Sequence, residues 1–179
     1  LSELIARTHY SMSTDDTRPH LAGALFEGDG KNVRMVTTDG HRLSKAGKKV
    51  SEGLMDFSML VASKGIAELR RLIEDAKGDK TKGDDKPMTV GIASVSGNAF
   101  FRRDGIQLSV KLADEQFPPY SKVIPQQQDR RIIISRTAFS EALRRIALVA
   151  SDKSGGVRLS IEAGKLHITS ENPDVGEGS

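Results

Sequence analysis

The densest run of chemically capable side chains lies at residues 37–43, with the sequence Thr-Thr-Asp-Gly-His-Arg-Leu. Asp39 and His41 stand two positions apart, and on a strand this spacing places both on one face, where they could form an acid–base pair. A hydrolase built on this pair would also need a nucleophile and an oxyanion site, and neither is identifiable beside them. Asp39-Gly40 is itself a turn signal, so a structural role is the simpler interpretation.

Metal and cofactor chemistry find little support. The four histidines, His9, His20, His41 and His167, include no pair at the short helical spacing of metal ligands. The chain has no Cys, which excludes disulfides, thiolate chemistry and Cys-based zinc sites. The Gly-Asp-Gly-Lys run at 28–31 has neither the spacing nor the following helix of a phosphate-binding loop. We therefore predict no catalytic residue, no metal site and no cofactor.

Basic residues gather on segments that we expect to be helical. The chain holds 27 Lys and Arg against 24 Asp and Glu, a net charge of +3, and its pI is near 9.2, which is compatible with nucleic acid without requiring it. Cations on the outer side of helices could contact DNA phosphates without reading sequence, whereas an ordinary solvated helix face is an equal alternative. The candidate DNA-facing residues are Arg7, Lys64, Arg70, Arg71, Arg136, Arg144 and Arg145.

The apolar pattern predicts an α+β fold with a mainly antiparallel sheet. A stripe at helical spacing predicts a helix over 1–12, and Ser63 is a candidate N-cap for a helix over 64–76. The charged, Gly-rich run at 77–87 predicts a surface loop. Strands are expected at 21–27, 33–38, 54–61, 88–94, 98–103 and 106–112, with turns at 28–30, 96–97 and 104–105 and a polar connection between 38 and 54.

The order of elements recurs along the chain. Residues 1–7, Leu-Ser-Glu-Leu-Ile-Ala-Arg, are similar in character to residues 139–145, Phe-Ser-Glu-Ala-Leu-Arg-Arg. After each comes a polar turn, a strand, a Gly turn and a second strand. Helix-then-hairpin also recurs by chance, but the repeat favours two domains of one type, which we place at 1–128 and 129–179.

Both ends interrupt expected elements. The chain has no initiator Met, begins inside an apolar helical pattern without a cap, and ends in a polar stretch. We therefore expect a fragment, with the first strand of its first domain missing and its second domain truncated. No apolar run approaches the roughly 18 residues that cross a bilayer, and no signal-peptide pattern is present, so we expect a cytoplasmic protein.

Four segments resemble the bacterial DNA sliding clamps, the beta subunits of DNA polymerase III. The runs Thr-Asp-Gly-His-Arg-Leu at 38–43 and Phe-Pro-Pro-Tyr-Ser-Lys-Val-Ile-Pro at 117–125 resemble signature stretches of that family, in its order and near its spacing. Residues 20–27 resemble the strand after the first helix of the clamp's middle domain. Residues 156–159 with 168–173 resemble the opening hairpin of its third domain, so the resemblance covers essentially the whole chain.

The resemblance implies a non-catalytic processivity factor of a DNA-directed DNA polymerase holoenzyme. In this family two protomers of three similar domains close head to tail into a ring around duplex DNA, with helices lining the hole and antiparallel sheets on the outer face. The ring holds a polymerase at high effective concentration. The implied partners are duplex DNA without sequence preference, the replicative polymerase, the clamp loader, repair polymerases and a second copy of the chain. A generic protein-interaction scaffold is the remaining alternative.

The resemblance also implies a pocket for short linear motifs between the middle and last domains. Leucine, proline and valine side chains would form an apolar cup, basic side chains a cationic rim, and a glycine would allow close backbone approach. Each apolar residue taken singly could equally be core. The matching positions are Arg18, Leu21, Thr38, Gly40, His41, Arg42, Leu43, Pro118, Lys122 and Val123.

Some positions depart from the family pattern or extend it. Pro19 and His20 stand where the family often has aromatic residues, which weakens the resemblance at that part of the surface. Lys122 replaces a frequent Arg, keeping the charge and losing bidentate geometry. Leu148 and Val149 match positions that contribute to the dimer interface of the family's third domain. The rest of the pocket wall would come from the end of the last domain, which we do not expect in this chain.

Overall fold

The computed structural model describes residues 1–15, 17–50, 56–78, 89–150, 156–172 and 176–178. The chain forms two compact units, Leu1–Ile124 (unit 1) and Pro125–Ser179 (unit 2). Both combine helices with antiparallel strands, so the expected α+β class is confirmed. The limits expected for the two domains, 1–128 and 129–179, stay predictions about independently folding parts.

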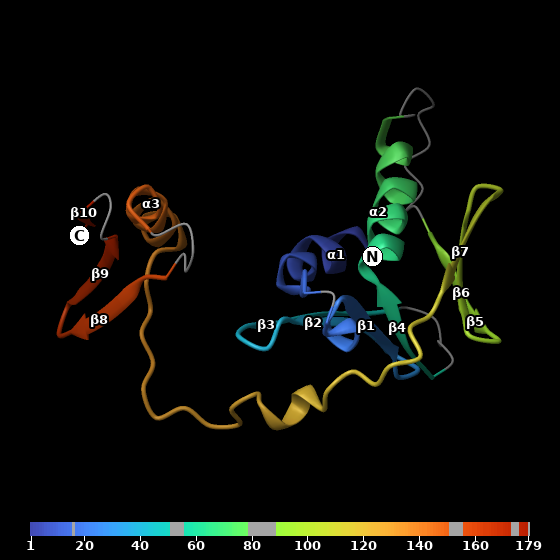
Figure 1. Cartoon of the computed structure of the whole chain (residues 1–179), viewed down its shortest axis with the longest axis horizontal. Helices are drawn as coiled ribbons and strands as arrows, with labels where there is room; N and C mark the ends of the chain where they lie inside the picture. The colour runs from blue at the N-terminus through green and yellow to red at the C-terminus, as the bar shows by residue number, and fades with distance from the viewer. Residues whose placement is uncertain (16, 51–55, 79–88, 151–155, 173–175, 179) are drawn as a thin grey trace. The chain divides into compact units, whose positions relative to one another are not determined.

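Unit 1 is built on a four-stranded antiparallel sheet with the order β3-β2-β1-β4 (Figure 1). The strands are β1 (Gly23–Gly28), β2 (Asn32–Thr38), β3 (Leu43–Lys49) and β4 (Phe57–Ala62). The predicted Gly turn joins β1 to β2, and Gly30 has a φ of 76°, which glycine adopts without strain. Of the expected strand at 54–61, Leu54 and Met55 lie outside the described residues.

β3 is a strand where the sequence analysis expected only a polar connection. Its inward residues are small, because Ser44 and Ala46 are buried while Lys45 and Gly47 between them are exposed. The period-two alternation is therefore present, but without the large apolar residues that would have revealed it. β3 is also an edge strand, and lysines on an edge oppose pairing with another chain.

Two helices cover one face of this sheet (Figure 1). The first, α1 (Ser2–Thr8), continues only as a 3₁₀ turn, η1 (His9–Ser11), so the helix expected over 1–12 is shorter than predicted. Thr8 has a φ of −129°, and Met12 is already extended. The second helix, α2 (Ser63–Gly78), agrees with the prediction for 64–76, within the usual uncertainty of helix ends. Of the loop expected at 77–87, Lys77 and Gly78 instead belong to the end of α2, and residues 79–87 lie outside the described part.

The core of unit 1 lies between the helices and the sheet. Ile5 from α1 and Leu69 from α2 pack in one buried cluster with Phe26, Met35 and Val61, whose side chains alternate onto the helix-facing side of their strands. Burying large apolar side chains of this kind stabilises the fold by about 1.5–3 kcal/mol each. This packing fixes the sheet and the two helices as one body.

A second antiparallel sheet, with the order β5-β6-β7, completes unit 1. Its strands are β5 (Gly91–Val95), β6 (Asn98–Arg103) and β7 (Ile106–Lys111), which confirms the predicted meander, although Met88 of the first expected strand lies outside the described residues. Ser96-Gly97 and Asp104-Gly105 all have positive φ, as a two-residue type I′ hairpin turn requires.

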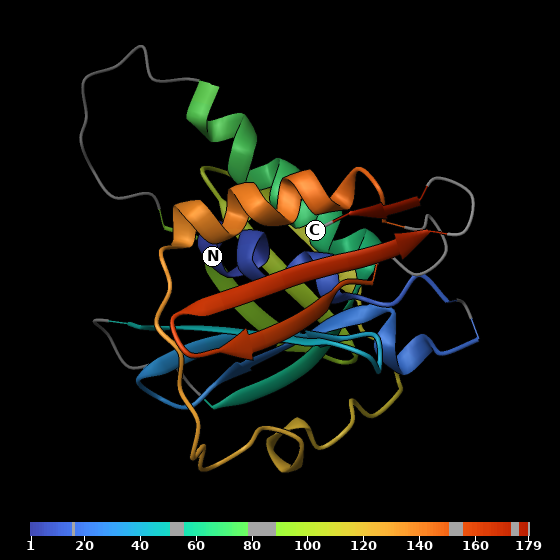
Figure 2. The ribbon, with the colours of Figure 1, turned by 90° about the vertical axis from the view of Figure 1, so that its left-hand side faces the viewer.

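After β7 the chain crosses the face of the four-stranded sheet that lies opposite the helices. We call residues 113–123 the strap; in Figures 1 and 2 it is the yellow segment beside that face. It contains the 3₁₀ turn η3 (Tyr120–Lys122). Leu25 and Leu60, which point to this face, line a hollow together with strap residues.

Unit 2 repeats the order of helix and hairpin found at the start of unit 1. Its elements are α3 (Arg136–Ala147), β8 (Arg158–Glu162), β9 (Lys165–Asn172) and β10 (Gly176–Gly178), with the antiparallel order β10-β9-β8. The Ser135 hydroxyl caps α3 by accepting a hydrogen bond from the Ala138 N–H. Ile146 of α3 and Ile168 of β9 are buried where the helix packs on the hairpin.

Candidate functional site

A hollow of about 500 Å³ in unit 1 brings together three residues of the predicted pocket, Arg18, His41 and Arg42. It lies between η1, the segment leading into the 3₁₀ turn η2 (Pro19–Leu21), and the β2–β3 turn. The other lining residues are His9, Tyr10, Met12, Ser13, Thr14, Asp15, Ala22, Asp39 and Ser63. The rim is therefore rich in cations and hydrogen-bonding groups.

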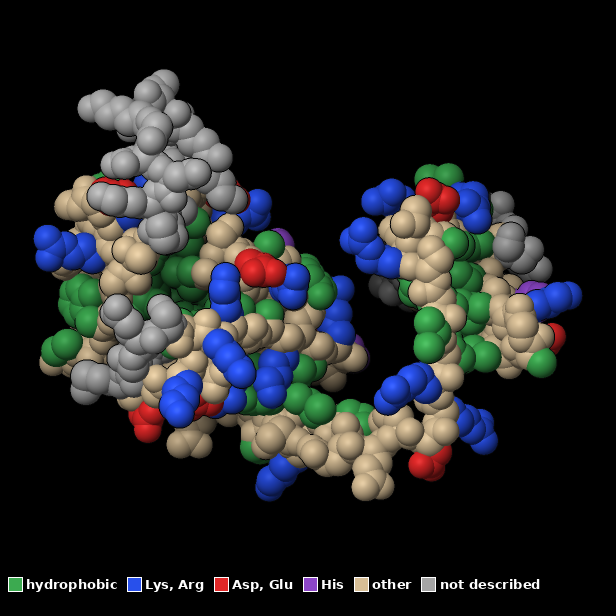
Figure 3. All heavy atoms as spheres, turned by 180° about the vertical axis from the view of Figure 1, so that it is seen from behind, with side chains coloured by type: hydrophobic (Ala, Val, Ile, Leu, Met, Phe, Trp, Pro, Cys, Tyr) green, Lys and Arg blue, Asp and Glu red, His purple; other side chains and the backbone are tan. Residues whose placement is uncertain are grey.

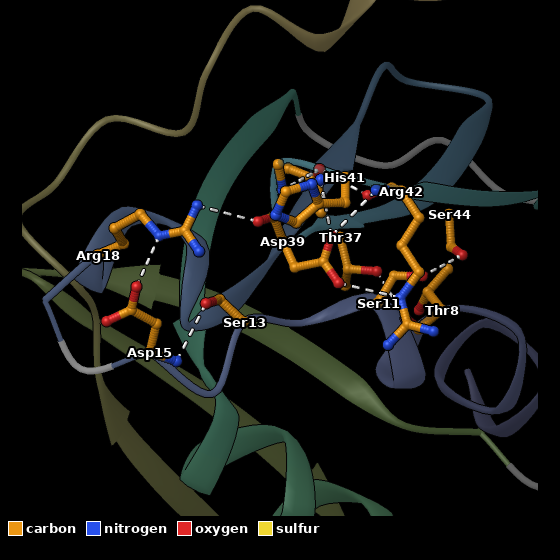
Figure 4. A network of polar contacts seen from close by, with 12 residues as sticks. Thr8, Ser11, Ser13, Asp15, Arg18, Thr37, Asp39, His41, Arg42 and Ser44 are labelled. Carbon is orange, nitrogen blue, oxygen red and sulfur yellow. Dashed lines mark hydrogen bonds and ion pairs between the residues drawn. The ribbon is translucent and has the colours of Figure 1, made fainter. Parts of the chain in front are cut away.

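The β2–β3 turn is organised by the carboxylate of Asp39 (Figure 4). Oδ1 accepts hydrogen bonds from the backbone N–H groups of His41 at 2.9 Å and Arg42 at 3.0 Å. Oδ2 accepts a further bond from Nε of Arg42 at 3.0 Å. The turn interpretation of Asp39-Gly40 is thereby confirmed, and the turn presents His41 and Arg42 as exposed side chains.

These bonds also determine the charge of Asp39. Partial burial raises the pKa of its carboxyl, but the N–H groups of Arg42 and His41 and the Arg42 guanidinium outweigh that effect, and the pKa is lowered below its usual range. Asp39 is thus an ionised acceptor already committed to three donors. Its bond with His41 involves the backbone and not the imidazole, so the acid–base pair of the hydrolase hypothesis is not formed.

Arg18 lies across the hollow from the β2–β3 turn and reaches over to it. Its Nε donates to Oδ2 of Asp15 at 2.9 Å, and its Nη1 donates to the backbone carbonyl of Asp39 at 3.1 Å. Gly40 is required beside it, because a Cβ there would lie 3.1 Å from Nη1 of Arg18 and the φ of Gly40 is 91°. The guanidinium is therefore held in place before any ligand arrives.

Buried hydroxyl groups hold the elements beside the hollow. Thr38 Oγ1 donates to the carbonyl of Arg42 at 2.7 Å and accepts from the N–H of Gly40 at 3.1 Å, so this predicted site residue shapes the turn. Behind it, Thr37 Oγ1 donates to the carbonyl of Thr8 at 2.6 Å. The sequence analysis did not identify this network, because nothing in the sequence shows which hydroxyl meets which carbonyl.

The apolar residues of the predicted pocket differ in accessibility. Leu21 is only 5% exposed, Leu43 and Pro118 are half-buried, and Val123 is 69% exposed. Pro118 lines a different hollow, of about 540 Å³, beneath the strap. Lys122, next to Val123 on the strap, is exposed. The structure therefore groups the polar part of the predicted pocket, and the apolar cup stays a prediction.

Two apolar residues that were not predicted as site residues line the hollow around Arg18, His41 and Arg42. Tyr10 is exposed and Met12 half-buried, and both face the hollow beside Arg18. Both fall within the helix expected over 1–12. The early end of α1 instead places them on η1 and the extended residue after it, where they can offer apolar surface to a ligand.

All seven candidate DNA-facing residues are exposed. Three of them form ion pairs with glutamates on their own helices, at 2.6 Å for Arg7–Glu3, 2.7 Å for Arg70–Glu74 and 2.9 Å for Arg71–Glu68. Lys64, Arg136, Arg144 and Arg145 have no ion pair with any side chain that the structure describes. In Figure 3, Lys and Arg side chains are spread over the visible face of both units, with Asp and Glu among them. Whether they contact DNA stays a prediction.

The two residues expected at a dimer interface have different surroundings. Leu148, just after α3, is 83% exposed, whereas the Val149 side chain packs against Gly178 of β10 within unit 2. Within the described part of the chain, no three His, Asp or Glu residues lie close enough to share a metal ion. None of the described helices is long and apolar enough to cross a membrane.

Comparison with known proteins gives a family match for each of the two units. Residues 1–119 match the family described as DNA polymerase III beta subunit, central domain, and residues 121–179 match its C-terminal domain. The chain is 33% identical over 177 residues to the beta sliding clamp of Escherichia coli K12, covering 99% of this chain and 46% of the relative. It is 32% identical over 182 residues to that of Caulobacter vibrioides, again with 99% and 46% covered.

A solved structure agrees with these matches. The DNA polymerase sliding clamp from Pseudomonas aeruginosa superposes with a TM-score of 0.83 at 32% identity, covering 99% of this chain and 46% of that one. This likeness confirms the expected clamp fold. The chain spans about half the length of the curated relatives it matches.

Proposed function

This chain belongs to the bacterial DNA sliding clamps, the beta subunits of DNA polymerase III, and we propose that it forms part of a ring that encircles duplex DNA and tethers a polymerase. The observation that carries the proposal is the pair of family matches, central domain and then C-terminal domain, which together span the chain. The function is topological: a closed ring cannot leave DNA sideways, so its bound polymerase stays at high local concentration. The chain would be a non-catalytic subunit acting in the cytoplasm.

The proposed partner site is the hollow around Arg18, His41 and Arg42. Arg18 is held by Asp15 and by the carbonyl of Asp39, and Arg42 is held by the Asp39 carboxylate. Such preorganised cations favour acidic side chains or backbone carbonyls of a short peptide. Hydrophobic anchors of the peptide would use Leu21, Leu43, Pro118 and Val123, with Lys122 adding charge. The ligands would be short motifs from the replicative polymerase, the clamp loader and repair polymerases.

The proposed DNA contacts come from the exposed Lys and Arg residues of α1, α2 and α3. Ion pairs to Glu3, Glu68 and Glu74 moderate three of these charges. Weak, sequence-independent contacts suit a ring that must slide, because tight phosphate contacts would stop it. We place Leu148 and Val149 at the interface between two copies of the chain, which would close the ring.

Titration with a peptide from the polymerase C-terminus tests the partner site. Arg42→Ala removes a preorganised cation and Leu43→Ala a hydrophobic contact, so each should weaken binding to the full-length protein by about tenfold. Arg102→Ala is a matched control, since Arg102 is an exposed arginine on β6 outside the site. Unchanged affinity in Arg42→Ala and Leu43→Ala would contradict the site assignment.

A further inference from the structure

The strap is attached to the four-stranded sheet of unit 1 at two places, with a hollow between them. Just before the strap, Leu112 forms an antiparallel bridge with Val61. The first strap residue is also attached, because the N–H of Ala113 donates to the carbonyl of Leu60 at 3.1 Å. Near its end, Tyr120 reaches back to the sheet. Between these points the strap lies over the hollow of about 540 Å³, so it is not closely packed on the sheet along its whole length. The Tyr120 contacts therefore help to set the position of the far end.

Tyr120 meets a preformed acceptor on β1. Its hydroxyl donates to Oε2 of Glu27 at 2.8 Å, and its ring lies 5.4 Å from Nζ of Lys45. The same Glu27 oxygen faces Nε of Arg34 at 3.3 Å, and Arg34 also pairs with Asp29 at 3.0 Å. Glu27 is therefore ion-paired with a half-buried arginine. A hydrogen bond to such a charged group is stronger than one between neutral groups.

The turn that begins at Tyr120 carries two of the proposed peptide contacts. The N–H of Val123 donates to the carbonyl of Tyr120 at 3.2 Å, and the N–H of Lys122 donates to the carbonyl of Pro119 at 3.1 Å. The side chains of Lys122 and Val123 are exposed. Their backbone positions are thus tied to the position of Tyr120.

We infer that the Tyr120–Glu27 hydrogen bond is a latch that positions Pro118, Lys122 and Val123 for the peptide ligand. This inference rests on the proposed function of the same site. Tyr120 acts here as a positioning residue, since its role is to hold the strap against the sheet. Breaking the latch would loosen the strap end, so that binding must first order it again. The Arg18–Arg42 part of the site, on other elements, would be unaffected.

Two measurements on the full-length protein test the latch. Tyr120→Phe removes only the hydroxyl, and Glu27→Ala removes its acceptor. Each should speed hydrogen exchange of the amides at 117–124 and weaken binding of the polymerase C-terminal peptide by about tenfold. The double variant should bind no more weakly than Glu27→Ala, because in that variant the Tyr120 hydroxyl has already lost its acceptor. Glu27→Gln keeps an acceptor and should recover part of the affinity.

Glu68→Ala is the matched control, since it removes an exposed glutamate bonded to Arg71 on α2, away from the strap. It should change neither exchange at 117–124 nor peptide affinity. Faster exchange with affinity within about twofold of wild type would overturn the positioning role, and unchanged exchange would overturn the latch itself. Absence of binding to the wild-type protein would instead refute the proposed function, and the positioning role with it.

Discussion

The guanidinium of Arg18 donates a hydrogen bond from Nη1 to the backbone carbonyl of Asp39, 3.1 Å away. This bond joins the segment before η2 to the β2–β3 turn, two parts of the chain that are far apart in sequence. Because the carboxylate of Asp39 in turn holds Arg42, the two arginines are fixed on either side of the same residue (Figure 4). The proposed partner site thus has a cationic rim whose two arginines are already hydrogen-bonded before binding.

Gly40→Ala should destabilise the turn. The φ of 91° disfavours any residue with a Cβ, and that Cβ would crowd Nη1 of Arg18. We expect a loss of about 1–2 kcal/mol in the free energy of unfolding, measured by urea denaturation, together with weaker peptide binding. Gly47→Ala is the control, since a Cβ at Gly47 on β3 makes only ordinary contacts and its φ is not positive. Equal stability of the two variants would contradict this account.

Asp39→Asn should lower stability at neutral pH and alter its pH dependence. The folded protein holds the pKa of Asp39 below the usual 3.8, so its ionised form contributes stability above that value, and the contribution is lost as pH falls through the lower folded pKa. We expect a deficit of about 1 kcal/mol at pH 7 that shrinks in acid. Urea denaturation of both proteins from neutral to acid pH measures it, and a deficit that grows in acid would refute the assignment.

Tyr120 should ionise at higher pH than an ordinary tyrosine. Burial raises its pKa above 10.0, and the hydrogen bond to Glu27 and the negative charge of Glu27 raise it further. The latch is therefore complete below pH 10 and is lost as pH rises through the folded pKa. The difference in phenolate absorbance between the full-length protein and its Tyr120→Phe variant reports Tyr120. Its midpoint should exceed 10.0 and fall on adding Glu27→Gln; a midpoint below 10.0 would exclude the latch.

Arg144 and Arg145 of α3 should matter more for DNA than Arg70 and Arg71 of α2. Arg70 and Arg71 are paired with Glu74 and Glu68, whereas Arg144 and Arg145 have no ion pair among the described side chains. Substituting both α3 residues with Ala should reduce loading onto DNA, with a smaller dependence on salt concentration. The matched double substitution at Arg70 and Arg71 should have a weaker effect. Equal losses in the two variants would contradict this ranking.

Several elements could be predicted because their cause is local. The turns at 96–97 and 104–105 contain Gly residues that take positive φ, and the strands around them alternate regularly. β3 could not be recognised in the same way, since Ser44 and Ala46 give its buried face no strong apolar signal. Its burial depends on packing under α1, a tertiary contact that no local pattern encodes.

The site was only partly predictable. The resemblance supplied Arg18, His41 and Arg42, and the structure brings these three around one hollow. The supporting bonds depend on residues distant in the chain, such as Tyr120 with Glu27, and these became visible only once the strap was seen to cross the sheet. Sequence reasoning therefore identified side chains that could bind a partner, whereas the residues that hold them in place required the fold.

Retention on DNA of different topology tests the central claim most directly. The full-length protein would be loaded by its cognate clamp loader onto nicked circular DNA, isolated with the DNA, and then divided, one half being cut with a single-site nuclease. A ring that encircles DNA should stay on the intact circles and slide off the linear molecules, because its hold is topological. Equal retention on circular and linear DNA would show binding by contacts alone and would contradict the proposal, as would failure to load on circles.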